Sequence, residues 1–148
     1  MTLKIKILPS PEGYTVPLPS AATAGSAGLD LAACLDRPVT LRPGEIAVIP
    51  CGAAVEIPAG HVGLVFGRSG LGIKHGVTLA NSVGVIDSDY RGELRAGLIN
   101  RSGEPYTVQP GERIAQLVIL PYAACTPVLA DELSESDRGA GGFGSTGR

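Results

Sequence analysis

Apolar residues occur along this chain in short runs of three to seven residues, separated by residues that favour turns. The runs cover residues 3–7, 39–41, 46–49, 53–57, 62–66, 83–86, 114–120 and 126–129. Arg-Pro-Gly-Glu at 42–45, Pro-Ala-Gly at 58–60 and Gln-Pro-Gly-Glu at 109–112 mark turns between them. Short strands at roughly 8–12-residue spacing with such turns are typical of an all-β sandwich, jelly roll or barrel.

One short helix and a terminal arm complete the predicted organisation. Residues 69–75 can form one or two helical turns after Arg68, with the free N–H groups of the first turn pointing at an anion. From about residue 130 the chain becomes polar and loses its strand pattern. The sequence therefore predicts one β-domain over residues 1–130 and an arm over residues 131–148.

Composition and charge narrow the classes of partner. A formal net charge of −2, without a basic patch, gives no general attraction to a nucleic-acid backbone and favours a small-molecule partner. No apolar run approaches the ~20 residues of a membrane helix, and residues 1–7 alternate like a strand rather than a signal peptide. Cys34, Cys51 and Cys125 lack metal-ligand spacing, which indicates reduced, buried thiols in a cytoplasmic protein.

The last eleven residues, 138–148, carry the strongest sign of chemistry. Their five glycines can turn backbone N–H groups towards one anion. Arg138 offers a planar fork for phosphate, Ser145 and Thr146 add hydroxyl donors, and Phe143 could cover a ring. Taken alone, the segment could equally be a disordered tail, and it lacks the lysine of a P-loop. A compact β-domain has few pockets for such an arm, which favours exchange of the arm between subunits.

Four further polar clusters interrupt the apolar runs. They are Ala-Gly-Leu-Asp-Leu at 27–31, Gly-Arg-Ser-Gly-Leu-Gly at 67–72, Asn-Ser-Val-Gly-Val-Ile-Asp-Ser-Asp-Tyr-Arg-Gly at 81–92, and Gly-Glu-Arg-Ile-Ala-Gln-Leu at 111–117. With the arm, in this order and at these intervals, they resemble the trimeric dUTP pyrophosphatase (dUTPase) family over about residues 3–148. The resemblance implies a jelly-roll-like β-fold with one short helix, and a homotrimer whose active sites lie between subunits. It differs from the common pattern by Gly67, where a proline is frequent, and by Cys51 in a turn.

The resemblance implies hydrolysis of dUTP to dUMP and pyrophosphate, which keeps uracil out of DNA and supplies dUMP for thymidylate synthesis. This reaction needs a base for the water that attacks the α-phosphorus. Asp87 is the predicted base, because it follows the apolar Val85-Ile86 and so lies nearer a pocket wall than Asp89. The structural alternative is that Asp87 only shapes the Asp-Ser-Asp turn.

Cations and hydrogen-bond donors must also neutralise the triphosphate. The predicted phosphate-binding residues, from two of the internal clusters and the arm, are Arg68, Ser69, Gln116, Arg138, Ser145 and Thr146. Gly70 and Gly144, in the same segments, are also predicted to contact the substrate. Mg²⁺ is expected to bind mainly through the triphosphate, with Asp30 acting through a water, although Asp30 could instead cap a turn. Arg113 is expected to serve a subunit interface or strand pairing.

Base and sugar recognition are assigned to the hairpin 81–90. Its backbone at Val85 and Ile86, together with the Asn81 amide, can match the pairing edge of uracil and leave cytosine unsatisfied. Tyr90 resembles the family tyrosine that packs beneath deoxyribose, although a tyrosine of the β-core is the structural alternative. Phe143 would stack on the base when the arm closes.

Two other functions stay open. A dCTP deaminase-like enzyme resembles this type of fold, but it would need a catalytic glutamate about five residues beyond Gly92, where Arg-Ala-Gly-Leu at 95–98 offers no carboxylate. Glu93 is nearby but is expected to face away. A nucleotide-binding β-trimer without catalysis is the second possibility, and the intact polar clusters disfavour it.

Overall fold

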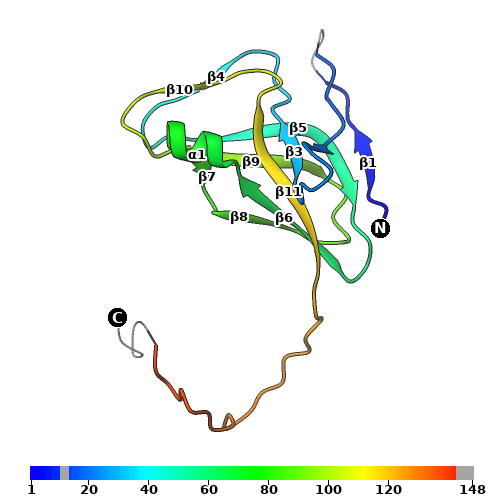
Figure 1. The fold of residues 1–148 in the computed structure, drawn as a ribbon, viewed down its shortest axis with the longest axis vertical. Coiled ribbons are helices and arrows are strands. Elements are labelled where there is room, and N and C mark those ends of the chain that lie inside the picture. The colour runs from blue at the N-terminus through cyan, green and yellow to red at the C-terminus, as the bar shows by residue number, and fades with distance from the viewer. Residues whose placement is uncertain (11–13, 143–148) are drawn as a thin grey trace.

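Strands dominate the computed structural model, which describes residues 1–10 and 14–142 (Figure 1). The elements are β1 Lys4–Ile7, β2 Ser20–Ala21, β3 Leu29–Ala32, β4 Val39–Leu41, β5 Ile46–Glu56, β6 His61–Gly67, α1 Ser69–His75, β7 Val77–Leu79, β8 Val83–Ile86, β9 Glu93–Asn100, β10 Tyr106–Val108 and β11 Arg113–Pro121. This element content confirms the predicted all-β class with a single short helix.

Two antiparallel sheets enclose the core. One sheet has the strand order β1-β5-β9-β7 and the other β2-β3-β11-β6-β8, while β10 and β4 form a separate pair. Leu31 and Leu117 of the second sheet pack in one buried cluster with Ile49 and Leu98 of the first. Because each such side chain contributes about 1.5–3 kcal/mol when fully buried, this shared cluster holds the two sheets face to face as a sandwich.

Helix α1 follows β6 directly, and its two ends are defined by Arg68 and Gly76. Arg68 precedes the helix in an extended conformation, and Gly76 ends it in the left-handed region at φ 67°, with its N–H bonded to the carbonyl of Gly72. A side chain at Gly76 would also meet Ser102 at 2.9 Å, so glycine is required there on two counts. Buried Leu71 anchors the helix to the body, and the predicted helix over 69–75 is confirmed. Among the residues that the structure describes, no helix has the length and apolar character needed to span a membrane.

Several strands differ from the sequence-based expectation. The runs 46–49 and 53–57 belong to one strand, β5, whose pairing with β9 shifts register between Pro50 and Ala54. Strands β2, β3, β7, β9 and β10 lie outside the predicted runs. The strand predicted over 126–129 is wrong for the single chain, since these residues are exposed and belong to no strand, and the chain has left the sheets by this point (Figure 1).

The cysteines are all free thiols, but only two are buried. Cys34 and Cys51 lie in the interior, as predicted, whereas Cys125 is exposed on the segment after β11, so the expectation of a buried thiol is wrong there. Burial, followed by the nearby carboxylate of Glu93, raises the pKa of Cys51 to about 12. Its thiol therefore stays protonated at neutral pH and is unreactive, which leaves Cys125 as the accessible cysteine.

Candidate active site

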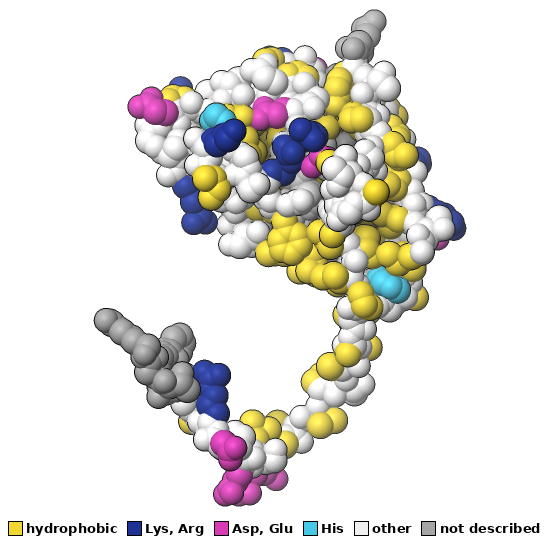
Figure 2. Space-filling view, viewed as in Figure 1, with side chains coloured by type: hydrophobic (Ala, Val, Ile, Leu, Met, Phe, Trp, Pro, Cys, Tyr) yellow, Lys and Arg dark blue, Asp and Glu magenta, His cyan; other side chains and the backbone are white. Residues whose placement is uncertain are grey.

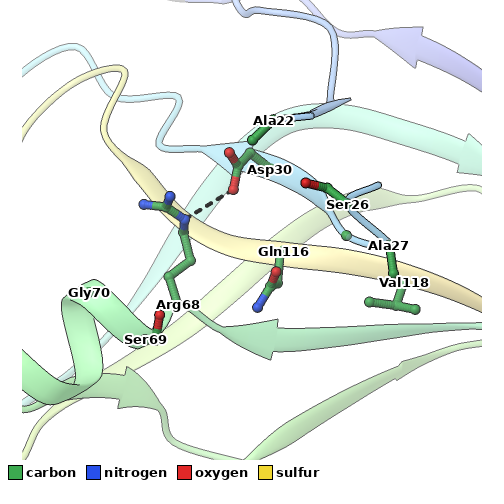
Figure 3. A pocket seen from close by; sticks show the side chains of 10 residues that line it. Ala22, Ser26, Ala27, Asp30, Arg68, Ser69, Gly70, Gln116 and Val118 are labelled. Carbon is green, nitrogen blue, oxygen red and sulfur yellow. Dashed lines mark hydrogen bonds and ion pairs between the residues drawn. The ribbon is translucent and has the colours of Figure 1, made fainter. Parts of the chain in front are cut away.

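Three of the predicted clusters meet in one cavity of about 380 Å³, which we call the Arg68 cavity (Figure 3). Asp30 comes from β3, Arg68 and Ser69 from the junction of β6 and α1, and Gln116 from β11. These elements are adjacent because β11 pairs with β3 on one side and with β6 on the other. The cavity therefore depends on the order of strands in the second sheet, and its wall combines an arginine, a hydroxyl and an amide suited to phosphate oxygens.

An ion-pair cluster orients Arg68 at this cavity. The Arg68 Nε donates to Asp30 Oδ1 at 3.0 Å, and the Arg113 Nη1 donates to Asp30 Oδ2 at 2.9 Å. Arg68 Nη1 also donates to the carbonyl of Arg113 at 3.2 Å. One carboxylate thus holds two guanidinium groups, so the cluster keeps a positive charge and leaves Arg68 Nη2 free of partners among the described residues.

Asp30 and Arg113 have positions that the sequence specified only in part. Asp30 lies within β3 and pairs with two arginines, so the alternative of a turn cap is wrong. Arg113 links β11 to β3 across the sheet, which fits the predicted strand-pairing role. Through Asp30 it also adds a positive charge beside the cavity, and the predicted set of site residues omitted it. Each Asp30 oxygen has a second lone pair, so the carboxylate can still accept a hydrogen bond from water.

Gln116 is held between two glycines. Its Nε2 donates to the carbonyl of Gly67 at 3.2 Å, and its Oε1 lies over Gly28, where an added Cβ would approach it to 2.6 Å. Gly28 therefore permits the observed Gln116 rotamer because it has no side chain. Gly67, where a proline is common in the resembling family, lies against Thr78, whose Oγ1 would meet a Cβ at 2.9 Å.

The contact between Gly28 and Gln116 gives a testable prediction. Gly28→Ala is expected to displace the Gln116 amide and to lower kcat/KM for the predicted substrate, dUTP, by about tenfold, since the predicted contact of this amide with a substrate phosphate would be lost. Steady-state kinetics would measure the effect. Gly25→Ala is the matched control, because a Cβ at Gly25 meets nothing within 4 Å. Equal activity of the two variants would contradict the expectation that Gly28 holds the Gln116 amide in place.

The cluster that contains Asp87 lies elsewhere on the molecule. Asp87 follows β8 and lines a cavity of about 660 Å³ and another of about 240 Å³, and neither includes Arg68 or Gln116. Arg91 closes the turn beyond Asp87 by donating from Nη1 to the carbonyls of Ser88 at 2.7 Å and Tyr90 at 3.0 Å. No pattern in the sequence predicts this contact, although Arg91 stands directly beside the predicted tyrosine.

Strand register explains the separation. Ile86 pairs with Gly63, so Asp87 lies near the beginning of β6, whereas Arg68 follows the end of that strand. Six extended residues span about 20 Å. A general base must lie within roughly 3 Å of the proton it accepts, directly or through one water. One chain therefore cannot place its own Asp87 and its own Arg68 on the same phosphate.

The other predicted residues of this cluster lie around β8. Val85 and Ile86 belong to β8, the edge strand of the second sheet, and Asn81 lies in the preceding turn. Tyr90 is 43% exposed, which excludes the alternative of a β-core tyrosine, and its hydroxyl donates to the carbonyl of Glu93 at 3.0 Å. Its ring occupies the space that a side chain at Gly92 would fill.

Residues 131–142, the described part of the arm, line neither the Arg68 cavity nor the two cavities at Asp87. Arg138 is exposed and donates from Nε to the carbonyl of Gly141 at 2.8 Å, and Gly139 takes a left-handed φ of 51°. Phe143, Gly144, Ser145 and Thr146 lie outside the described residues. Gly70, by contrast, lines the same cavity as Arg68.

Comparison with known proteins shows the family to which the chain belongs. The dUTPase family model matches residues 15–147. The chain belongs to the dUTPase family. The deoxyuridine 5'-triphosphate nucleotidohydrolase of Idiomarina loihiensis is 50% identical to this chain over 147 residues, which cover 99% of this chain and 97% of the relative. That of Aeromonas salmonicida is 51% identical with the same coverage.

Solved structures of dUTPases share the fold. Staphylococcus bacteriophage 80alpha dUTPase with dUPNHPP matches with a TM-score of 0.88 and 31% identity over 99% of both chains. A mutant dUTPase from phage phi11 of S. aureus, described with a structural Mg(II) ion, matches with a TM-score of 0.77 and 28% identity over 89% of this chain and 98% of that chain. The predicted jelly-roll-like fold is thereby confirmed.

The contacts of Glu93 bear on the alternative that the chain is a dCTP deaminase-like enzyme. Its Oε1 accepts from the backbone N–H of Gly52 at 3.0 Å and its Oε2 accepts from Arg95 Nε at 3.0 Å. The carboxylate is thus engaged with the first sheet and does not line the Arg68 cavity. Glu93 does border the cavity of about 240 Å³ that contains Asp87 and Tyr90, so the expectation that it faces away holds only for the Arg68 cavity. The family match and these contacts together favour the hydrolase.

Proposed function

We propose that this dUTPase family member hydrolyses dUTP to dUMP and pyrophosphate through attack of a water on the α-phosphorus. Asp87 accepts the proton of that water, and the Arg68 cavity binds the triphosphate. The observation that carries the proposal is that Arg68, ion-paired with Asp30, and Gln116, hydrogen-bonded to Gly67, lie at one wall of the cavity. Together they present cationic and amide donors to phosphate oxygens. The reaction removes dUTP, which keeps uracil out of DNA, and supplies dUMP for thymidylate synthesis.

The complete site forms between copies of the chain, in a homotrimer. The distance of about 20 Å along β6 between Asp87 and Arg68 supports this assembly, because each half-site needs a complementary half from a neighbour. The exposed Val83 and Val85 on β8 and Leu120 and Tyr122 around the end of β11 support it further, since such apolar residues are expected at a subunit contact.

The phosphates are bound by Arg68, Ser69, the backbone at Gly70, and Gln116. Mg²⁺, when bound, supplies charge neutralisation at the triphosphate oxygens. In residues 1–10 and 14–142 no group of three or more His, Cys, Asp and Glu could hold a metal ion, so this donor set fits a cation that is bound mainly by substrate and waters. Asp30 would contact that hydrated ion through a water while it orients Arg68.

Uracil is recognised along the edge of β8. An edge strand presents unpaired N–H and C=O groups, which can match the pairing edge of a base as they would match a neighbouring strand. Val85 and Ile86 offer these backbone groups and Asn81 adds its amide, while Tyr90 lies ready to pack against the deoxyribose. Ser82, in the adjoining turn, has a left-handed φ of 64°, a strained conformation of the kind that occurs at binding sites.

The arm, residues 131–148, closes over a site that residues 1–130 of other copies form. Arg138 would contact the terminal phosphate, Ser145, Thr146 and the backbone at Gly144 would add donors, and Phe143 would stack on uracil. The free thiols of Cys34 and Cys51 support a reducing, cytoplasmic location.

Pyrophosphate release tests the function. The full-length chain with Mg²⁺ would be supplied with dUTP, dCTP, dTTP or UTP, and a chain that ends at Asp137 would be measured beside it. We expect release from dUTP alone and a large loss on truncation. Ammonia release from dCTP would instead indicate a deaminase, and dUTP binding without any turnover would indicate a non-catalytic nucleotide-binding trimer.

A further inference from the structure

The arm carries a concentrated negative charge before its glycine-rich end. Asp131, Glu132, Glu135 and Asp137 fall within seven positions, 131–137, and this acidic segment is exposed. Figure 2 shows these acidic side chains at the bend of the arm, away from the body of the same chain. Residues 1–130 contain equal numbers of acidic and basic residues, so the negative balance of the chain comes from the arm.

A basic cavity of about 310 Å³ lies on the body beside α1 and next to the Arg68 cavity. Lys74, Arg68 and Arg113 line it, together with His75 and Glu112. Lys74 is exposed and forms no ion pair within residues 1–10 and 14–142. Figure 2 shows basic side chains gathered on the part of the body that carries α1.

The acidic groups near this basic cavity are held by other partners. Glu112 accepts a hydrogen bond from the Tyr106 hydroxyl through Oε1 and from the Gln109 N–H through Oε2. Asp30 is shared by two arginines. Because three cationic side chains stand against these two carboxylates, the cavity keeps a net positive charge that suits a short acidic peptide.

We propose that the acidic segment 131–137 of a second copy docks in this basic cavity. The two cavities share Arg68 and Gly70 as lining residues, so they are contiguous. Arg138 directly follows the acidic segment, so docking of residues 131–137 beside α1 would place Arg138 at the Arg68 cavity. The inference rests on the proposed closure of the arm and adds the contact that places it.

The path of the chain favours a second copy over the same one. The segment that leads to the arm leaves β11 at Pro121, at the far end of the strand from Arg113, and a nine-residue strand spans about 30 Å. After β11 the chain leaves its own body and then bends, and its described part does not run back along β11 (Figure 1). An arm of another copy can approach the basic cavity without this reversal.

Crosslinking of the full-length chain tests the docking directly. In a Cys125→Ser background, Ile73→Cys is combined with Ser134→Cys and treated with a short bis-maleimide. Ile73 is 87% exposed next to Lys74, and Ser134 lies within the acidic segment, so both substitutions leave every charge in place. The matched control replaces Ile73→Cys with Ile7→Cys on β1, because β1 and the α1-packed β7 are opposite edges of one sheet.

We expect a covalent dimer on a denaturing gel at roughly ten times the yield of the Ile7 control, because docking raises the effective concentration of the two thiols. Addition of Lys74→Glu should lower that yield about fivefold, as should high salt. A crosslink within one chain, or a yield equal to that of the control, would overturn the proposal. dUTP hydrolysis by the same untreated variants is measured separately: normal hydrolysis without the dimer overturns only the docking, whereas the dimer without hydrolysis overturns only the function.

Discussion

Asp87→Asn is expected to lower kcat for dUTP hydrolysis by about 100-fold or more while KM changes little. Asparagine keeps the size and the turn of the native residue but cannot accept the proton of the attacking water at neutral pH. The turn itself depends on Arg91, which bonds the carbonyls of Ser88 and Tyr90, and on the Tyr90 N–H, which bonds the Asp87 carbonyl at 3.2 Å. None of these contacts uses the Asp87 carboxylate, so the variant should fold normally.

Asp89→Asn is the matched control for this prediction. Both aspartates border the cavity of about 660 Å³, but only Asp87 also lines the cavity that contains Tyr90. Steady-state kinetics with both variants, and equilibrium binding of a non-hydrolysable dUTP analogue, would separate loss of chemistry from loss of binding. Near-normal turnover by Asp87→Asn, or an equal loss in Asp89→Asn, would remove Asp87 from the role of base.

The fold was predictable where local signals coincide. Strands β4 and β8 and helix α1 occupy the ranges that the apolar runs and the Arg68 boundary predict. Strand β9 escaped prediction because Ala96 and Gly97 have weak strand preference, and its stability comes from β5 and β7 on either side. The continuity of β5 through Pro50 likewise depends on tertiary pairing, with a shift of register that local sequence does not encode.

The candidate site was predictable as a set of residues but not as a shape. The sequence placed Arg68, Gln116 and Asp30 in separate clusters, and strand order in the second sheet brings them together. The ion pair between Arg113 and Asp30 crosses from β11 to β3, and no spacing along the chain predicts it. The separation of Asp87 from this group follows from antiparallel register alone, which only the paired strands reveal.

The separation of Asp87 from Arg68 predicts a large recovery of activity when two inactive variants are mixed. Arg68→Ala removes the oriented guanidinium from one half-site, and Asp87→Asn removes the base from the other. Each variant alone should be nearly inactive, because every site in its trimer lacks one of the two groups. If each site takes Arg68 from one copy and Asp87 from its neighbour, a site with both native groups forms only where an Asp87→Asn copy supplies Arg68 and an Arg68→Ala copy supplies Asp87.

Random reassembly of equal amounts of the two variants should therefore restore about a quarter of the native sites, and about a quarter of the native rate, from almost none. The two proteins would be mixed, unfolded and refolded together, and dUTP hydrolysis would be compared with each variant treated alone. Asp89→Asn mixed with Asp87→Asn provides the control for dilution and refolding. Activity of the Arg68→Ala and Asp87→Asn mixture no higher than that of its components would mean that both groups act from a single chain, against the register that holds them about 20 Å apart along β6.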